Sequence, residues 1–249
     1  FWDTAQYYLP FLRRYAPETE VIVDSVDIHF LREEREAEMK NDPELRAKAA
    51  ERKRFELATY RQADRLWVIT EADKKAIEKL VQNVPIDIVP NIHQPVINEK
   101  SFVETSDLLF IGNFSHPPNT DAIIHFCQET LPIIRRELPD VKLHIVGGNA
   151  SPQVQALASK NINVAGYVED LTPYLMKARV SISPLRYGAG MKGKVGEAMS
   201  WGLPVVTTSI GAEGMDLLHE QDALIADSPQ EFAEAVVQAY TNQELWERL

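Results

Sequence analysis

The chain has 249 residues, 45% hydrophobic and 25% charged, which is enough apolar mass for one large domain or two small ones. Its formal net charge of −11 argues against a general nucleic-acid-binding protein, because such affinity depends on a basic face. The single cysteine, Cys127, excludes an internal disulfide and indicates a reducing compartment such as the cytoplasm. It occupies an apolar helical position, so we expect a buried structural thiol. The sequence contains no apolar run of about eighteen residues. It begins with Phe1 rather than Met, so we expect it to be a piece of a longer polypeptide.

The first part of the sequence predicts helices interspersed with short strands. An amphipathic pattern predicts a helix over 1–16, whose apolar side is formed by Tyr7, Tyr8, Phe11, Leu12 and Tyr15. The charged stretch 31–60 has no glycine and predicts two helices broken near Pro43, with a largely solvated face. Thr70 and Asp73 form a capping pattern that predicts a helix to about Gln82. Short strands are predicted at 20–26, 65–69 and 86–89.

The polar stretch 96–107 is the best candidate for a linker, so we predict domains at 1–100 and 101–249. Beyond it, strands and helices alternate regularly, which predicts right-handed βαβ units and a parallel sheet. Six strands in two halves predict a doubly wound, Rossmann-like α/β fold with strand order 3-2-1-4-5-6. The strands are expected near 107–112, 141–146, 162–165, 179–183, 203–207 and 222–226, and the helices near 119–138, 152–160, 170–178, 193–201, 229–241 and from Asn242.

In that order, ligands bind where strands 1 and 4 are neighbours, outside their carboxyl ends. The loop after strand 1 runs from Gly112 to Asn119, and the loop after strand 4 begins the unusual stretch 184–204, so we expect the two loops to face one another. The second loop combines Gly188, Gly190 and Gly193 with three cations, Arg186, Lys192 and Lys194, and it opens into a helix at about Gly193. Backbone N–H groups, a helix N-terminus and cations at one place favour a phosphate ligand. The alternative is a tight βα turn whose lysines are merely solvated.

Several other sites are not indicated by the sequence. The dinucleotide fingerprint, the Walker pattern and paired Cys/His metal spacings do not occur. We therefore expect no metal ion and no bound cofactor.

Beyond the cationic glycine loop, the chain contains the segments Glu197-Ala198-Met199, Gly202-Leu203-Pro204 and Gly211-Ala212-Glu213-Gly214, together with Pro117-Pro118-Asn119 and Gly166-Tyr167-Val168-Glu169-Asp170. With these segments, the residues from 108 to 249 resemble the donor-binding domain of a GT-B glycosyltransferase of the retaining family four, or group 1, type. The resemblance is densest over Gly188–Gly214. Residues 1–95 resemble the second half of the acceptor-side domain. The resemblance implies a GT-B fold and transfer of a sugar from a nucleotide diphosphate sugar, bound as a substrate.

The resemblance also implies roles for individual residues. Glu197 matches the second of the paired glutamates that the family uses to hold the ribose hydroxyls, although it could instead be a helix residue paired with a lysine. The backbone of Gly188 and Gly190 would approach the donor sugar and diphosphate. Tyr167 and Val168 would border the base. Further donor contacts are expected from the first loop, at Gly112, Asn113, His116 and Asn119.

The chain departs from the family pattern at two places. Ala189 stands where the first glutamate of the pair is expected, and the arginine and lysine usual near the first loop are missing. We hypothesise that Arg186, Lys192 and Lys194 supply the charge for the diphosphate from the second loop. On the acceptor side, His29 follows a predicted strand beside Asp27. The family often has a histidine near the reacting sugar, so both are candidate catalytic residues, whereas a lone histidine after a strand is more often structural.

Three functions fit these observations. The first is a metal-independent glycosyltransferase of polysaccharide biosynthesis, acting on a glycan, lipid or protein acceptor, with no nucleic-acid partner. A membrane contact would come through an N-terminal region outside these residues. The second is a nucleotide-sugar epimerase of related fold, and the third is a catalytically degenerate binding or scaffold module of a larger protein. Ala189 favours the third, and Glu197 with the cationic glycine loop argues against it.

Overall fold

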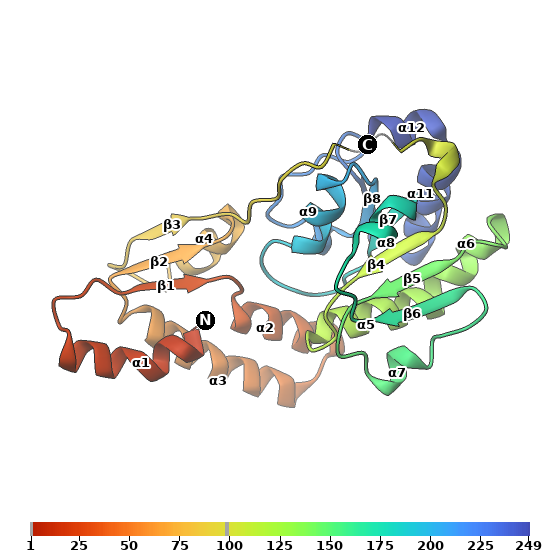
Figure 1. Ribbon diagram of the computed structural model, residues 1–249. Coiled ribbons are helices and arrows are strands. Elements are labelled where there is room, and N and C mark those ends of the chain that lie inside the picture. Colours follow the sequence, from red (N-terminus) through yellow and green to blue (C-terminus); the bar gives the residue numbers. More distant parts are fainter. Residues whose placement is uncertain (1, 98–99) are drawn as a thin grey trace. The chain divides into compact units, whose positions relative to one another are not determined.

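The computed structural model describes residues 2–97 and 100–249 (Figure 1). Residue contacts divide the chain into two compact units. The first consists of Phe1–Ile92 with Tyr187–Met191 and Glu213–Met215, and the second of His93–Arg186, Lys192–Ala212 and Asp216–Leu249. Phe1 of the first predicted helix and positions 98–99 of the predicted linker lie outside the described residues. The proposed domain boundary at residue 100 stays a prediction.

The first unit contains a parallel three-stranded sheet with the order β1-β2-β3, formed by Ile22–Ser25, Arg65–Val68 and Ile86–Ile88. Side chains alternate across it, so that Val23 and its register neighbour Leu66 are buried while Ile22 is exposed. Helices α1 (Trp2–Tyr15), α2 (His29–Lys40), α3 (Pro43–Tyr60) and α4 (Glu71–Ile77) all contribute to the core on the Val23 side.

The predicted break between the two charged helices is confirmed. Asn41 adopts the left-handed conformation with φ of 48° and ends α2, and the Asp42 side chain accepts hydrogen bonds from the N–H groups of Glu44 and Leu45 at 2.8 and 3.2 Å. Pro43 then occupies the first turn of α3, where its missing N–H costs nothing. The predicted cap at Thr70 is also confirmed, because its side chain accepts from the Asp73 N–H at 3.0 Å.

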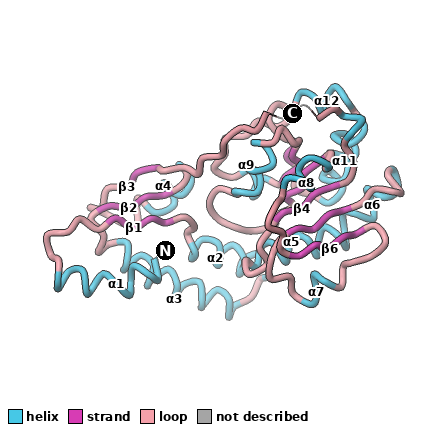
Figure 2. Tube along the Cα trace, viewed as in Figure 1, coloured by secondary structure: helices cyan, strands magenta, loops and turns pink. Residues whose placement is uncertain are grey.

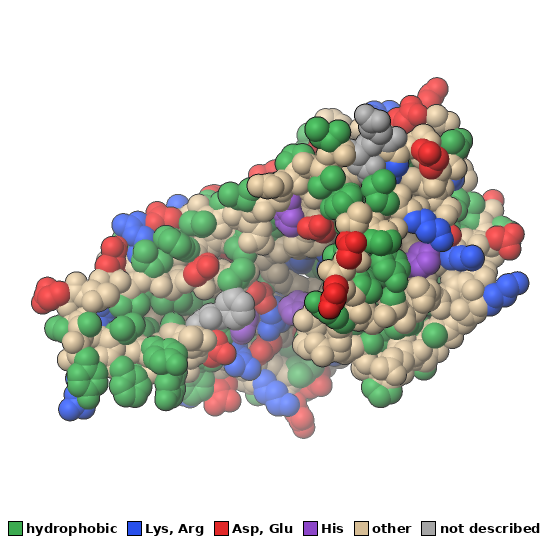
Figure 3. All heavy atoms as spheres, in the orientation of Figure 1, with side chains coloured by type: hydrophobic (Ala, Val, Ile, Leu, Met, Phe, Trp, Pro, Cys, Tyr) green, Lys and Arg blue, Asp and Glu red, His purple; other side chains and the backbone are tan. Residues whose placement is uncertain are grey.

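Two expectations about this unit were wrong. Helix α4 ends at Ile77 rather than near Gln82. The aromatic side of α1 faces solvent, with Tyr7, Phe11 and Tyr15 exposed by 65%, 53% and 73%, and hydrophobic side chains gather over this helix in Figure 3. The helix packs instead through Trp2, Ala5 and Leu9, spaced three and four residues apart, because this row faces the core of β1 and α3.

The second unit contains a parallel six-stranded sheet with the order β6-β5-β4-β7-β8-β9. Numbered from β4, this is the predicted order 3-2-1-4-5-6, so the doubly wound prediction is confirmed. The strands are β4 (Leu108–Ile111), β5 (Leu143–Val146), β6 (Ile162–Gly166), β7 (Val180–Ser183), β8 (Val205–Thr207) and β9 (Leu224–Ile225).

Helices connect these strands (Figure 2). They are α5 (Pro117–His125), α6 (Leu131–Glu137), α7 (Pro152–Gln155), α8 (Thr172–Lys177), α9 (Gly193–Ser200), α10 (Ser209–Ala212), α11 (Pro229–Thr241) and α12 (Gln243–Arg248), with a short 3-10 turn at Phe102–Glu104.

The single helix predicted over 119–138 is instead α5 and α6 joined by a π-helical turn, Phe126–Thr130. The turn ends at Thr130, two residues before Pro132, which has no N–H for a regular helical bond and so favours a change of hydrogen-bond register there. Cys127 lies in this turn and packs against the core, and burial raises the pKa of its thiol to about 12. The thiol is therefore structural, as expected.

Candidate functional site

The loops after β4 and β7 meet through one asparagine. Asn119, in the first turn of α5, donates from Nδ2 to the backbone carbonyl of Asn113 at 2.8 Å and accepts at Oδ1 from Lys194 Nζ of α9. Because β4 and β7 are neighbouring parallel strands, both loops leave the sheet at its carboxyl edge. The predicted contact between the two loops is confirmed.

The positive charge of Lys194 is only partly balanced by the groups around it. Its ammonium group contacts the buried amide of Asn119 and lies 4.8 Å from the ring centroid of the fully buried Phe110. Burial, and then the nearby charge of the buried Lys192, lower the pKa of Lys194 to about 7. An amide dipole and an aromatic ring offset only part of the cost of burying a charge. This position therefore favours an anion from outside the chain.

Arg186 differs from Lys194 in having an anionic partner. Its guanidinium group donates to both carboxylate oxygens of Asp121 on α5, at 2.8 and 2.5 Å. A bidentate pair of this kind matches the charge of the arginine within the chain. Arg186 therefore has to give up one or both of its hydrogen bonds to Asp121 before it can bind a ligand.

Glu197, on α9, is held by two ring nitrogens. Trp201 Nε1 donates to one carboxylate oxygen at 3.3 Å, and His93 Nδ1 lies 3.5 Å from the other. The His93 ring packs directly on Gly196, where an added Cβ would lie 2.5 Å from it, so this glycine is required for the close approach. Part of the Glu197 side chain, 38%, stays exposed and can accept hydrogen bonds from hydroxyl groups. The sequence analysis did not identify this contact, because His93 lies about a hundred positions from Glu197 in the chain.

The other predicted residues of the first loop lie at the same sheet edge. Gly112 is buried directly after β4, and Asn113 is exposed, with its side chain accepting from the Ser115 N–H at 2.9 Å. His116 is the half-buried N-cap residue of α5. These residues shape the loop around Asn119.

Four predicted donor residues lie elsewhere. Tyr167 and Val168 follow β6, two strands away from β4 on the same edge, and Tyr167 is 76% exposed. Gly188 and Gly190 belong to the segment Tyr187–Met191, which groups with the first unit. Gly190 has a φ of +66°, a conformation that favours glycine. The donor roles of these four residues stay predictions.

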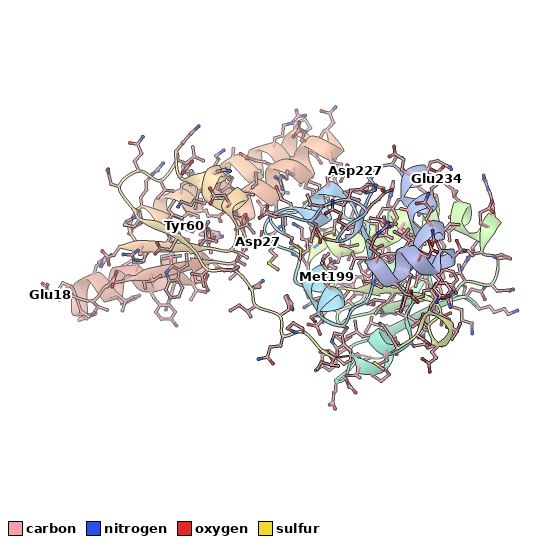
Figure 4. All side chains as sticks on the ribbon, turned by 90° about the horizontal axis from the view of Figure 1, so that it is seen from above. Glu18, Asp27, Tyr60, Met199, Asp227 and Glu234 are labelled. Atoms are coloured by element: carbon pink, nitrogen blue, oxygen red, sulfur yellow. The ribbon has the colours of Figure 1, made fainter. Side chains whose placement is uncertain are left out.

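In the first unit, the predicted Asp27 and His29 lie between the end of β1 and the start of α2 (Figure 4 labels Asp27). Asp27 Oδ2 forms an ion pair with Arg32 and lies 3.9 Å from His29 Nε2. Asp27 Oδ1 is buried and has no hydrogen-bond partner in the described part of the chain. A buried acceptor without a donor is costly, and a hydroxyl group of a ligand would satisfy it.

The backbone of this site is held by Glu56, a residue that sequence analysis missed. Its two carboxylate oxygens accept from the N–H groups of His29 and Phe30 at 3.0 and 2.9 Å, and Tyr60 OH donates to it at 2.7 Å. The side chain is completely buried, and burial raises the pKa of Glu56. Tyr60, labelled in Figure 4, also lies 2.5 Å from Ser25 Oγ. The carboxylate thus caps α2 from another helix, in place of Ile28 at the N-cap.

Over residues 2–97 and 100–249, no group of three or more His, Cys, Asp or Glu is arranged to hold a metal ion. No helix within the same residues is both long and apolar enough to cross a membrane.

Comparisons with known proteins identify relatives of this chain. A family model described as glycosyl transferases group 1 matches residues 105–242. A 44.6 kDa protein in the cps region of Klebsiella pneumoniae is 29% identical over 158 residues, covering 60% of this chain and 40% of the relative. The putative glycosyltransferase YtcC of Bacillus subtilis is 26% identical over 159 residues, covering 57% of this chain and 38% of YtcC. The chain thus spans about two fifths of the length of these relatives.

Among solved structures, Anabaena HepE in complex with UDP and glucose superposes with a TM-score of 0.71 at 12% identity, covering 98% of this chain and 68% of HepE. At this identity the match shows the fold alone. The fold is that of the GT-B glycosyltransferases, with Rossmann-like α/β domains, as the sequence resemblance implied.

Proposed function

The chain belongs to the glycosyl transferases group 1 family, and from this membership we propose that it is part of a retaining glycosyltransferase that uses a nucleotide diphosphate sugar. The second unit binds the nucleotide sugar at the carboxyl edge of its sheet. The acceptor is a glycan or another hydroxyl-bearing molecule. The complex of HepE with UDP and glucose supports a UDP-sugar as the donor. We assign the chain to polysaccharide synthesis, which the cps region of the Klebsiella relative supports.

The observation that carries this proposal is the position of Lys194. It lies at the switch point between β4 and β7, contacts a buried amide rather than a carboxylate, and has a pKa lowered to about 7 by burial and by Lys192. A diphosphate bound here forms an ion pair with the Lys194 ammonium group and stabilises the charged form of the lysine. The same contact stabilises the nucleoside diphosphate as it leaves the sugar.

Two further features support the donor site. Helix α9 begins at Gly193 with no side-chain cap, so the positive end of its dipole adds to the attraction for an anion. Glu197 lies one turn further along α9 and is oriented by His93 and Trp201. Its partly exposed carboxylate accepts the two ribose hydroxyls of the nucleotide.

In the first unit, Asp27 and His29 are the proposed contacts to the reacting hydroxyl groups. The buried Asp27 Oδ1 without a partner in residues 2–97 and 100–249 supports this role. Their part in catalysis is that of orientation and hydrogen bonding rather than of metal chemistry.

The test is nucleotide binding by isothermal titration calorimetry with UDP, GDP, ADP and dTDP. We expect one of them to bind, and the Lys194→Ala variant to bind it about 30-fold more weakly, because one charge-assisted contact contributes about 2 kcal/mol. Lys160→Ala is the matched control, since Lys160 is exposed and precedes β6 at the opposite edge of the sheet. Lys192→Ala measures the second cation.

Unchanged affinity in both the Lys192 and Lys194 variants would contradict the diphosphate site. A chain that binds none of the nucleotides would instead be a degenerate binding module. The chain is then incubated with a sugar nucleotide that carries the base found to bind. NMR of the products distinguishes sugar transfer from epimerisation.

A further inference from the structure

Trp2 forms a partly buried contact with the His29 ring. Its indole Nε1 lies 3.0 Å from His29 Nδ1, and the two rings meet edge to face with centroids 6.3 Å apart and an interplanar angle of 87°. Trp2 is 5% exposed, and the guanidinium group of Arg52 lies over its ring at 5.3 Å, so the indole is held in place. Sequence analysis assigned Trp2 no role.

The chemistry of the two rings fixes the direction of this hydrogen bond. An indole N–H can only donate, so His29 Nδ1 must accept with its lone pair. A neutral imidazole that accepts at Nδ1 carries its single proton on Nε2. Trp2 therefore selects one of the two tautomers of His29.

The surroundings also keep the ring neutral. Burial lowers the pKa of His29, and the positive charge of Arg52 acts in the same direction. The acidic groups Asp3 on α1 and Glu33 on α2 act in the opposite direction without outweighing burial. Asp27 Oδ2 also faces the ring, 3.9 Å from Nε2. At neutral pH the tautomer, rather than the charge, thus decides what the ring can do.

The backbone at His29 is fixed independently of its ring. Glu56 accepts from the N–H groups of His29 and Phe30, which sets where α2 begins. Glu56 thus fixes the main chain, whereas Trp2 fixes the protonation of the side chain. The two effects can be separated by substitution.

We propose that Trp2 is a positioning residue that holds His29 as the Nε2–H tautomer, so that His29 presents a hydrogen-bond donor at Nε2 and does not act as a general base. The consequence for catalysis rests on the proposed function, whereas the tautomer does not. A donor at Nε2 orients an oxygen of the sugar or stabilises negative charge that develops on it. Proton removal from the acceptor hydroxyl then falls to another group.

The test is histidine-selective 15N NMR of the whole 249-residue chain, with His29 assigned by loss of its signals in His29→Gln. We expect His29 Nδ1 to resonate as an unprotonated, pyridine-type nitrogen and Nε2 as a protonated, pyrrole-type nitrogen. In Trp2→Phe, which keeps an aromatic ring but has no donor, the two signals should move toward averaged values. Trp67→Phe, in strand β2, is the matched control and should leave them unchanged.

A proton on Nδ1 in the unsubstituted chain would overturn the proposal, and this measurement needs no variant that might unfold. An unchanged pattern in a folded Trp2→Phe chain would overturn the role of Trp2. The NMR arms need no substrate, so they stand even if the chain transfers no sugar. If the chain transfers a sugar, Trp2→Phe should lower kcat and leave KM unchanged. A merely structural role of Trp2 would instead lower the amount of folded enzyme without changing the tautomer of His29.

Discussion

Helices α2 and α9 begin in the same way but differ in what lies at their first turn. Neither has a side-chain hydrogen bond from its own N-cap residue, Ile28 for α2 and Lys192 for α9. At α2 the buried carboxylate of Glu56 satisfies two backbone N–H groups. At α9 the N-cap residue is itself a cation, Lys192, and Lys194 in the first turn contacts an amide. A helix start that the chain caps with its own anion is structural, whereas one lined by cations is suited to an anionic ligand.

The largest expected effect comes from removing the internal anion at α2. Glu56→Ala leaves the N–H groups of His29 and Phe30 buried without their acceptor, whereas the hydroxyl of Tyr60 keeps Ser25 Oγ as a partner. Each unsatisfied group costs about 1–3 kcal/mol, so we expect unfolding free energy to fall by about 3 kcal/mol or more. Urea denaturation followed by circular dichroism measures it.

Glu51→Ala is the control for Glu56→Ala, because Glu51 lies exposed on the same helix. We expect its effect to stay within about 0.5 kcal/mol. Similar losses for the two variants would mean that the carboxylate at α2 is not a structural cap, and the contrast between the two helix starts would fail.

The second prediction concerns the pH dependence of nucleotide binding at α9. In the free chain the pKa of Lys194 is lowered to about 7, mainly by burial, and a bound diphosphate raises it. Binding therefore takes up a proton above about pH 7. Affinity is highest below that pH and falls as pH rises, by up to about tenfold per unit, until the pKa of the complex is reached.

A nucleotide sugar is the right ligand for this measurement, because its diphosphate is esterified at both ends and has no titration of its own in this range. Calorimetry at about pH 8 in two buffers of different ionisation heat counts the protons taken up. In Lys194→Ala the uptake should disappear. Equal uptake in the variant would assign the proton to another group and remove the main evidence for an anion at α9.

The sequence predicted the parts of this comparison that depend on local pattern. Strand order around β4 and β7 followed from alternating apolar runs and turn residues, and the contact between their loops followed from that order. Trp2 contacts the ring of His29, and Glu56 contacts the backbone of His29, each 27 positions away in the sequence. Nothing in the local pattern marks either contact. Glu56 was interpreted as one more charge of a solvated helix, and the pattern could not distinguish it from Glu51.

The face of α1 was predicted wrongly for a different reason. Tyrosine combines an apolar ring with a polar tip, so that Tyr7 and Tyr15 count as apolar in a periodicity although both are exposed. Trp2 and Ala5 are the residues of α1 that contact the core, and Leu9 on the same row is buried. The hydrophobic periodicity predicts that a helix forms more reliably than it predicts which face of the helix is buried.

The smallest expected effect tests whether one cation or several serve the start of α9. The guanidinium group of Arg186 is already bonded to both oxygens of Asp121, at 2.8 and 2.5 Å. Recruiting it for a diphosphate would cost that pair, so we expect Arg186→Gln to weaken nucleotide binding by less than about threefold, or about 0.6 kcal/mol. Asp121→Asn removes the competing carboxylate and should leave affinity unchanged or increase it. If Arg186→Gln instead weakened binding as much as Lys194→Ala, the arginine would have to exchange Asp121 for the ligand. The carboxylate would then be a placeholder for the diphosphate, and α9 would resemble α2 more closely than its contacts indicate.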